Sequence, residues 1–159
     1  MDTTKNENMR NLLLLISSGL LILSCGVSKK NYQSDATSLI KMSKGVCFGA
    51  CPFYDITIDG TGKATYVGKK FVEKIGAFTK TFSPEETNLL FQKFKKADFW
   101  AFADEYTEEV TDLPTTFITF EHKGQSKRIK SYYGTPEALL ALINEVDAYS
   151  NTEGWKQID

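Results

Sequence analysis

The sequence predicts an α+β domain in which an antiparallel sheet of about five or six strands carries two helices on one face. Stretches of alternating apolar and polar residues occur in pairs joined by turn residues, as in β-hairpins. After each pair comes a helix start that contains proline and glutamate, at Ser83-Pro84-Glu85 and at Thr135-Pro136-Glu137. The domain is expected to span residues 38–157, about 120 residues, which is enough for one core.

The first half of the domain is expected to supply four strands. Residues 37–43 alternate loosely and are the candidate first strand. In the second, Tyr54, Ile56 and Ile58 share one face, the period-two pattern of a half-buried strand. The glycine-rich turn at 59–62 leads into a return strand at 63–67, and residues 76–82 form the fourth strand.

The first helix is expected to run from Pro84 to about residue 97, with Ser83 as its cap and Glu86 three residues later. Its apolar residues recur at helical spacing, so they should face the core. The next segment is rich in aromatic residues that we expect to be mostly buried: Phe99, Trp100, Phe102 and Tyr106.

A second hairpin and a second helix are expected to complete the domain. Thr116, Ile118 and Phe120 share one face of a strand, a turn lies near 122–125, and the chain returns through 126–133. The last helix begins at Thr135-Pro136-Glu137 with a buried stripe, and Trp155 is expected to fold back onto the body. The stripe consists of Leu139, Leu142, Ile143 and Val146.

The second hairpin also carries the best candidate for a contact patch on a folded partner. Its residues are basic or aromatic: Lys123, Lys127, Arg128, Lys130 and Tyr132. An edge strand that lysines protect from aggregation has the same composition, so the sequence leaves both interpretations open.

Residues 1–24 are predicted to be a secretory signal peptide. Lys5 and Arg10 precede an uncharged run at 12–23, which is shorter than the roughly 20 residues that a membrane-spanning helix needs. The run ends in Ile22-Leu23-Ser24-Cys25, which resembles a bacterial lipobox. Cys25 is therefore the predicted lipidation site, with an ordinary cleaved signal as the alternative.

Lipidation at Cys25 would place the mature protein in the bacterial cell envelope, facing the periplasm or the surface. The polar residues 25–37 are expected to be a tether, so the membrane is one partner, through the lipid anchor. A net charge of −1 argues against nucleic acid as a partner. The sequence has no phosphate-binding glycine loop, zinc spacing or dinucleotide fingerprint, and we expect no cofactor.

Cys47 and Cys51 are predicted to form a disulfide, because disulfides persist in an exported chain. The alternative is a copper site, since Cys-x-x-x-Cys-Pro also looks like the motif of thioredoxin-fold copper chaperones. In those proteins the motif opens a helix, whereas here a strand-like alternation follows, and the only third ligand would be the single histidine, His122.

The chain also resembles a family of uncharacterised bacterial cell-envelope domains. The resemblance covers roughly residues 38–157 and implies a single domain in the envelope, without an assigned activity. It rests on these motifs, in which x is any residue: Cys47-Phe48-Gly49-x-Cys51-Pro52-x-Tyr54, Asp59-Gly60, Tyr66-x-Gly68, Thr111-Asp112-x-Pro114-Thr115 and Tyr133-Gly134-x-Pro136.

The residues favour binding over catalysis. His122 is the only histidine and has no nucleophile motif beside it, and a set of carboxylates alone does not make a glycosidase. The acidic run at 104–112 also lacks the ligand spacing of an EF-hand. We expect a non-catalytic envelope lipoprotein that binds an envelope protein or a cell-wall ligand; the alternative is a redox or copper-handling protein that uses Cys47 and Cys51.

Overall fold

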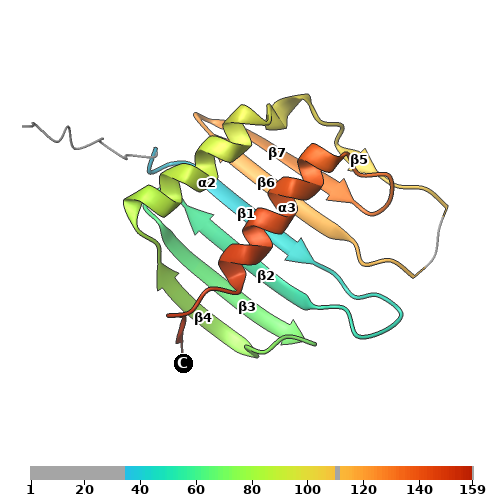
Figure 1. The fold of residues 1–159 in the computed structure, drawn as a ribbon, viewed down its shortest axis with the longest axis horizontal. Helices are drawn as coiled ribbons and strands as arrows, with labels where there is room; N and C mark the ends of the chain where they lie inside the picture. Colours follow the sequence, from blue (N-terminus) through green and yellow to red (C-terminus); the bar gives the residue numbers. More distant parts are fainter. Residues whose placement is uncertain (1–34, 110–111, 159) are drawn as a thin grey trace, which may run out of the picture. The chain divides into compact units, whose positions relative to one another are not determined.

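An eight-stranded sheet carries two helices across one of its faces, as Figure 1 shows. The computed structural model describes residues 35–109 and 112–158. The strand order is β5-β7-β6-β1-β2-β3-β4-β8, and neighbours are antiparallel except β5 and β7. The elements are β1 Leu39–Lys44, β2 Phe53–Asp59, β3 Lys63–Lys70, β4 Gly76–Thr81, α2 Pro84–Lys96, the 3-10 turn Phe99–Ala101, β5 Glu105–Tyr106, β6 Thr116–His122, β7 Gln125–Ser131, α3 Glu137–Ser150 and β8 Lys156–Gln157.

The predicted fold class is confirmed, but the sheet has eight strands instead of five or six. The six longer strands lie in the predicted segments. The additional strands, β5 and β8, have two residues each and lie at the two edges of the sheet. Two residues are too few to show an alternating pattern, so the sequence could not reveal them.

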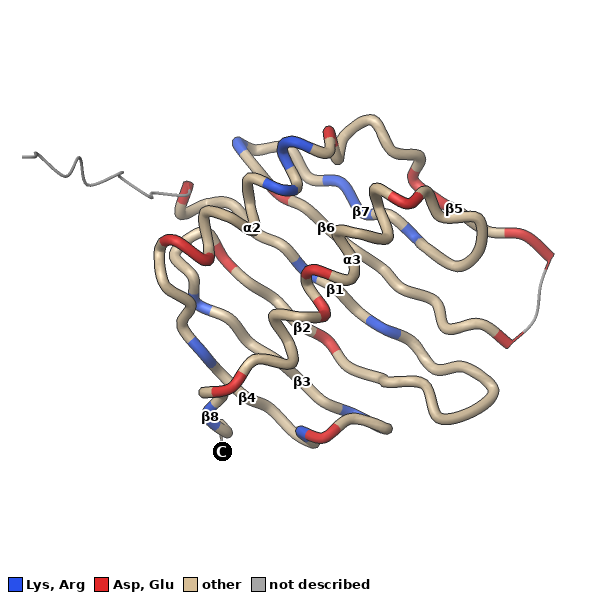
Figure 2. Tube along the Cα trace, in the orientation of Figure 1, with Lys and Arg blue, Asp and Glu red and all other residues tan. Residues whose placement is uncertain are grey.

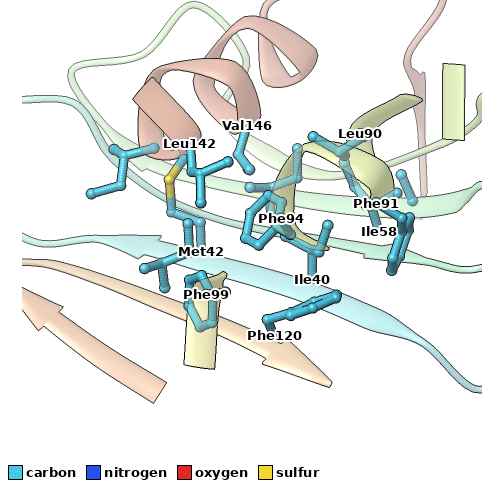
Figure 3. Close-up of a cluster of buried hydrophobic side chains, with 14 of the residues drawn as sticks. Ile40, Met42, Ile58, Leu90, Phe91, Phe94, Phe99, Phe120, Leu142 and Val146 are labelled. Atoms are coloured by element: carbon cyan, nitrogen blue, oxygen red, sulfur yellow. The ribbon is translucent and has the colours of Figure 1, made fainter. Parts of the chain in front are cut away.

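The core lies between the helices and the inner face of the sheet (Figure 3). In the central strand β1, Ile40 and Met42 are buried and pair with buried residues of β2 and β6 on either side. The aromatic segment after α2 closes one end of this core: Phe99 is fully buried, and Trp100 packs partly exposed against it. The predicted return of Trp155 is confirmed, because its ring centroid lies 5.7 Å from that of Tyr66.

Helix α2 begins as predicted. The Ser83 hydroxyl accepts the backbone N–H of Glu86, and the Glu86 carboxylate accepts the backbone N–H of Ser83 at 2.8 Å. These reciprocal bonds occupy N–H groups that a helix start leaves without partners. The helix buries one face against the sheet, consisting of Thr87, Leu90, Phe91 and Phe94.

Helix α3 begins differently from the prediction. Pro136 is its cap residue, and no side chain caps the helix start. The Thr135 hydroxyl lies 2.8 Å from the Ser131 hydroxyl, so it bonds to the end of β7 and not to the helix. The expected buried stripe of α3 is confirmed for Leu139, Leu142, Ile143 and Val146.

The predicted signal peptide, Cys25 and most of the tether lie outside the described residues. In the ranges 35–109 and 112–158, neither helix is long and apolar enough to cross a bilayer.

A candidate binding site at one end of the sheet

The inner face of the sheet becomes polar at one end. The strand register aligns Ser131, Thr116, Lys44, Tyr54 and Gly68 in a single row across β7, β6, β1, β2 and β3. The next row inward consists of Ile129, Ile118, Met42, Ile56 and Tyr66. We call the first group the polar row. It lies where β1 ends and β2 begins, towards the lower right of Figure 1.

A hydrogen-bonded network joins the polar row to helix α3. The Asp147 carboxylate accepts the Lys44 ammonium at 2.8 Å and also accepts the Tyr54 hydroxyl. Burial raises the pKa of Tyr54, and its hydrogen bond to Asp147 raises that pKa further, so Tyr54 stays a neutral donor. Tyr54 is only 2% exposed, whereas the Asp147 side chain is 32% exposed. Lys44 and Tyr54, on the sheet, therefore hold the Asp147 carboxylate in place, and the carboxylate remains partly exposed to solvent.

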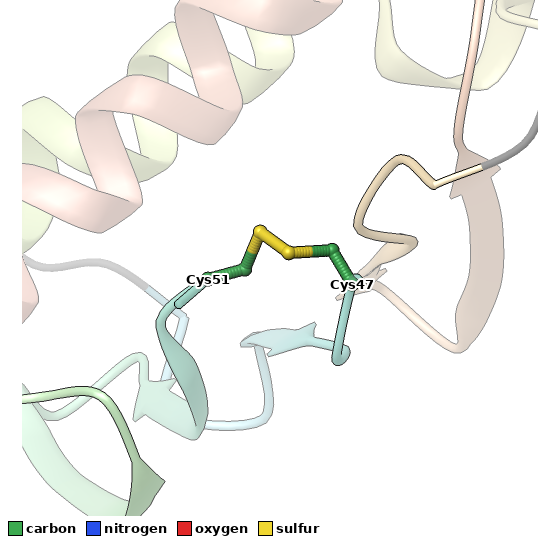
Figure 4. The surroundings of a disulfide bond; sticks show 2 residues. All are labelled: Cys47 and Cys51. Carbon is green, nitrogen blue, oxygen red and sulfur yellow. A yellow bond between two sulfur atoms is a disulfide. The ribbon is translucent and has the colours of Figure 1, made fainter. Parts of the chain in front are cut away.

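The loop between β1 and β2 is closed by the Cys47–Cys51 disulfide, which confirms the predicted pairing (Figure 4). The motif leads into strand β2 at Phe53 and not into a helix, as expected. A backbone hydrogen bond from Gly45 to Thr115, at 2.8 Å, ties the loop to the segment before β6. The loop carries no charged residue, and its Phe48 side chain is 91% exposed.

Exposed apolar side chains gather around this loop. Among the described residues, ten large apolar side chains are exposed, and seven of them lie in the loops or the first turn of α3 at this end of the sheet. Isolated exposed apolar residues are normal on a protein surface, whereas clusters of them are not, so this end of the sheet is the candidate for a contact surface. We call the seven residues the apolar rim: Val46, Phe48, Phe71, Ile75, Leu113, Tyr133 and Leu140.

Two cavities open at the rim, one on each side of the disulfide loop in strand order. The first, of about 340 Å³, lies beside β6 and β7 and is lined mainly by apolar groups, including Leu113, Tyr133 and Leu140. The second, of about 210 Å³, lies beside β2 and β3 and is more polar, with Asp147 in its wall. The motifs behind the family resemblance supply residues to both cavities.

The structure places the predicted contact patch on two faces of β7. The Lys127 ammonium is on the inner side, 3.0 Å from the Trp100 carbonyl oxygen and 3.1 Å from the Asp104 carboxylate. Arg128 is on the open face, 4.0 Å from the centre of the Phe117 ring.

The other patch residues are also separated. Lys130 pairs with Glu105 at 2.6 Å, Lys123 is exposed in the β6–β7 turn, and Tyr132 lines the first cavity. Figure 2 shows lysine and arginine residues along β7, whereas its neighbours β5 and β6 have none. The structure therefore does not bring the five residues together on one surface.

The His122 ring is at the opposite end of the sheet from the cysteines. Its Nδ1 lies 2.6 Å from the hydroxyl of Ser38, which precedes β1, whereas Cys47 follows β1. Burial lowers the pKa of His122, and Lys95 and Lys123 lower it further, which favours the neutral form of the ring. Cys47 and Cys51 are therefore not brought together with His122, either as a catalytic pair or as copper ligands.

The predicted acidic loop is partly paired with lysines. Asp104 contacts Lys127 and Glu105 contacts Lys130. Across the described parts of the chain, no cluster of three or more histidine, cysteine, aspartate or glutamate residues is arranged to hold a metal ion.

A family model for a domain of unknown function, DUF6438, matches residues 38–150, more than two thirds of the chain. The chain belongs to the DUF6438 family. A search of curated proteins finds no match. The DUF6438 region runs from the residue before β1 to the last residue of α3, so it includes the polar row, the disulfide loop and all lining residues of both cavities except Asn151.

Sequence reasoning missed Lys44, Asp147 and the rim residue Phe71 as site residues. A signal for Lys44 was present, because it falls in phase with Ile40 and Met42 and so belongs to the inner face of β1. No comparable local signal marks Phe71, whose backbone has a φ of 55° in the β3–β4 loop.

Proposed function

We propose that this DUF6438 protein is a non-catalytic binding protein of the bacterial cell envelope, anchored through a lipid on Cys25, and that its apolar rim contacts an envelope protein. The observation that carries the proposal is the concentration of exposed apolar side chains around the disulfide loop. Aromatic side chains supply much of the binding energy in protein interfaces, and Phe48 is the most exposed of those in the rim.

The disulfide supports this proposal physically. A loop that is already ordered loses less conformational entropy when a partner binds, so more of the contact energy appears as affinity. The Cys47–Cys51 bond holds Phe48 between its two cysteines, and Gly45 fixes the start of the loop. The loop is thus suited to present one aromatic side chain in a constant position.

The position at which the described chain begins also supports the proposed contact through the apolar rim. The described chain begins at Asp35, ahead of β1, and the rim lies beyond the other end of β1. With a lipid on Cys25, nine residues would lie between the anchor and Asp35, a span of at most about 35 Å from Cys25 to Asp35. Such a protein is able to direct its rim away from the anchoring bilayer, towards a partner.

Replacing Cys25 by alanine should move the protein from the membrane fraction to the soluble fraction, because the acyl chains would be the anchor. The measurement is fractionation of cells followed by immunodetection of the mature protein. Serine at Cys47 and at Cys51 is the control, since it removes thiols without touching the lipidation site. Continued membrane association of the Cys25→Ala protein would refute the lipid anchor.

Replacing Phe48 by aspartate should reduce partner capture by at least tenfold, because a charge in the interface must be desolvated without a counter-ion. The measurement is crosslinking in intact cells, affinity purification of the anchored protein and quantitative mass spectrometry. The matched control is Leu89→Asp, which places the same charge at an exposed apolar site on α2, outside the rim. If both variants capture the same proteins in equal amounts, the rim is not the contact surface.

A second candidate function uses the disulfide itself. Cys47 and Cys51 are both partly exposed, so the bond is open to thiol exchange. Under the binding proposal, thiol counting on freshly isolated mature protein should find both residues blocked before reduction and two more thiols after it. Free thiols ionised near pH 7, or copper bound at one per chain, would favour a redox or copper-handling protein instead.

A further inference from the structure

The smaller of the two cavities has a lining that differs from the rest of the rim. Its volume is about 210 Å³, and its walls combine apolar groups with two carboxylates, a carboxamide and an ammonium group. It lies over the rings of Tyr54 and Tyr66, whose centroids are 5.1 Å apart. The groups that face solvent are Pro52, Phe71, Glu73, Asn151 and the partly exposed Asp147, Val72 and Lys74.

The disulfide and a close approach of two backbone segments shape this cavity. Pro52 follows Cys51 directly, so the disulfide helps to set its position. On the other side, the 71–75 segment folds over Gly68, where a Cβ atom would lie only 1.7 Å from the Lys74 carbonyl oxygen. A residue larger than glycine at position 68 would thus displace the loop that carries Phe71 and Lys74.

The charges around the cavity balance. The Asp147 carboxylate is paired with the Lys44 ammonium through Oδ1, and Lys74 lies over the Tyr66 ring at 5.4 Å, next to Glu73. With Lys44 beside Asp147, two carboxylates and two ammonium groups lie at the cavity and their charges sum to zero, so neither a cation nor an anion meets a net charge that would attract it. A neutral ligand with hydrogen-bonding groups suits the site better.

Two polar groups that α3 and its end contribute to the lining have hydrogen-bonding atoms to offer a ligand: the Asp147 carboxylate and the Asn151 carboxamide. Among the residues that the structure describes, none donates to Asp147 Oδ2, and none bonds to the Asn151 side chain. A carboxylate oxygen accepts from hydroxyl groups, and a carboxamide both donates and accepts. Because Lys44 and Tyr54 already fix the orientation of the Asp147 side chain, little side-chain entropy is lost there when a ligand binds.

We propose that this cavity binds one neutral pyranose unit of a glycan, with its hydroxyl or acetamido groups on Asp147 and Asn151 and its C–H face on Phe71 and Pro52. The volume limits the ligand to a small unit, since it lies below the range of about 300 to 1,000 Å³ that is typical of pockets for drug-sized molecules. The cavity is open at the surface, so a longer glycan can continue beyond it. Sugar binding in this cavity does not require that the apolar rim contacts an envelope protein.

The test is a calorimetric titration of the mature, lipid-anchored protein in a detergent without a sugar head group. The probes are di-N-acetylchitobiose, which has the amino sugar of cell-wall glycans, and maltose, which has only hydroxyl groups. Saturable binding of either sugar at one per chain is expected. Stronger binding of di-N-acetylchitobiose would assign the site to amino-sugar glycans, and stronger binding of maltose would assign it to neutral hexose glycans.

Asn151→Ala and Asp147→Asn should each weaken this binding at least tenfold. Asn151 is exposed, so its variant should keep the fold even if Asp147→Asn loosens α3. The matched control is Asn144→Ala, an exposed asparagine on the same helix that does not line the cavity. No saturable binding of either sugar, or binding that both cavity variants retain, would overturn the inference. Phe48→Asp should leave sugar binding unchanged, so this test and the test of the rim can fail separately.

Discussion

Replacing Phe120 by alanine is expected to lower the free energy of unfolding by about 3 to 5 kcal/mol, the usual cost of removing a buried phenylalanine ring. Phe120 is fully buried in β6. Its ring lies 5.2 Å from that of Phe94, 5.7 Å from that of Phe99 and 5.3 Å from that of Trp100. These neighbours come from α2 and the turn after it, so alanine would leave a cavity where the helix layer meets the sheet.

The matched control is Phe117→Ala on the same strand. Phe117 is on the open face and only partly buried, and the Arg128 guanidinium lies 4.0 Å from the centre of its ring. Losing an exposed cation–π contact costs about 0.5 to 1 kcal/mol, so this variant should be much closer to the natural protein. Urea denaturation followed by circular dichroism measures both. Equal losses for the two variants would mean that the inner face of β6 does not form the core.

Replacing Gly68 by alanine is expected to lower the free energy of unfolding by about 1 to 3 kcal/mol, a typical cost of forcing extra atoms into a packed site. The added Cβ atom would meet backbone, the Lys74 carbonyl oxygen at 1.7 Å, and backbone cannot rotate away as a side chain can. The 71–75 segment must therefore lift. The same substitution should abolish sugar binding in the cavity below that segment.

Gly49→Ala is the control, because an added Cβ atom there would only make an ordinary contact with the Cys47 sulfur at 3.9 Å. Denaturation gives the stability of both variants. Limited digestion with trypsin, which cleaves after Lys70 and Lys74, reports whether the segment has lifted. If Gly68→Ala matches Gly49→Ala in stability and in digestion, the close approach of the two backbones is not a constraint on this protein.

Much of the fold could be predicted from local patterns. The alternation of Tyr54, Ile56 and Ile58 identified β2, and the Ser83-Pro84-Glu85-Glu86 start located α2. These predictions succeeded because a strand repeats every two residues, and a helix start must satisfy its own N–H groups within a few residues. The start of α3 was mispredicted because Thr135 bonds to Ser131 across a turn, a choice that neighbouring residues alone do not reveal.

The candidate site was much less accessible to sequence reasoning. The cysteine loop stood out, and its disulfide was predicted from the expectation of export. Phe48 belongs to the motif behind the family resemblance, but its exposure could not be predicted, because exposure depends on which distant parts of the chain pack against a side chain. Lys44 and Asp147 are 103 residues apart in the chain, and only the register of β1 against its neighbours and the placement of α3 bring them together.

The sequence by itself determined the α+β class, the inner faces of the long strands, the cap of α2 and the pairing of Cys47 with Cys51. Each of these depends on residues close together in the chain or on one repeating period. The tertiary structure alone decided the edge strands β5 and β8, the polar row and the gathering of the apolar rim. The physical reason is that these features arise across strands, where antiparallel pairing brings loops from distant parts of the chain to the same end of the sheet.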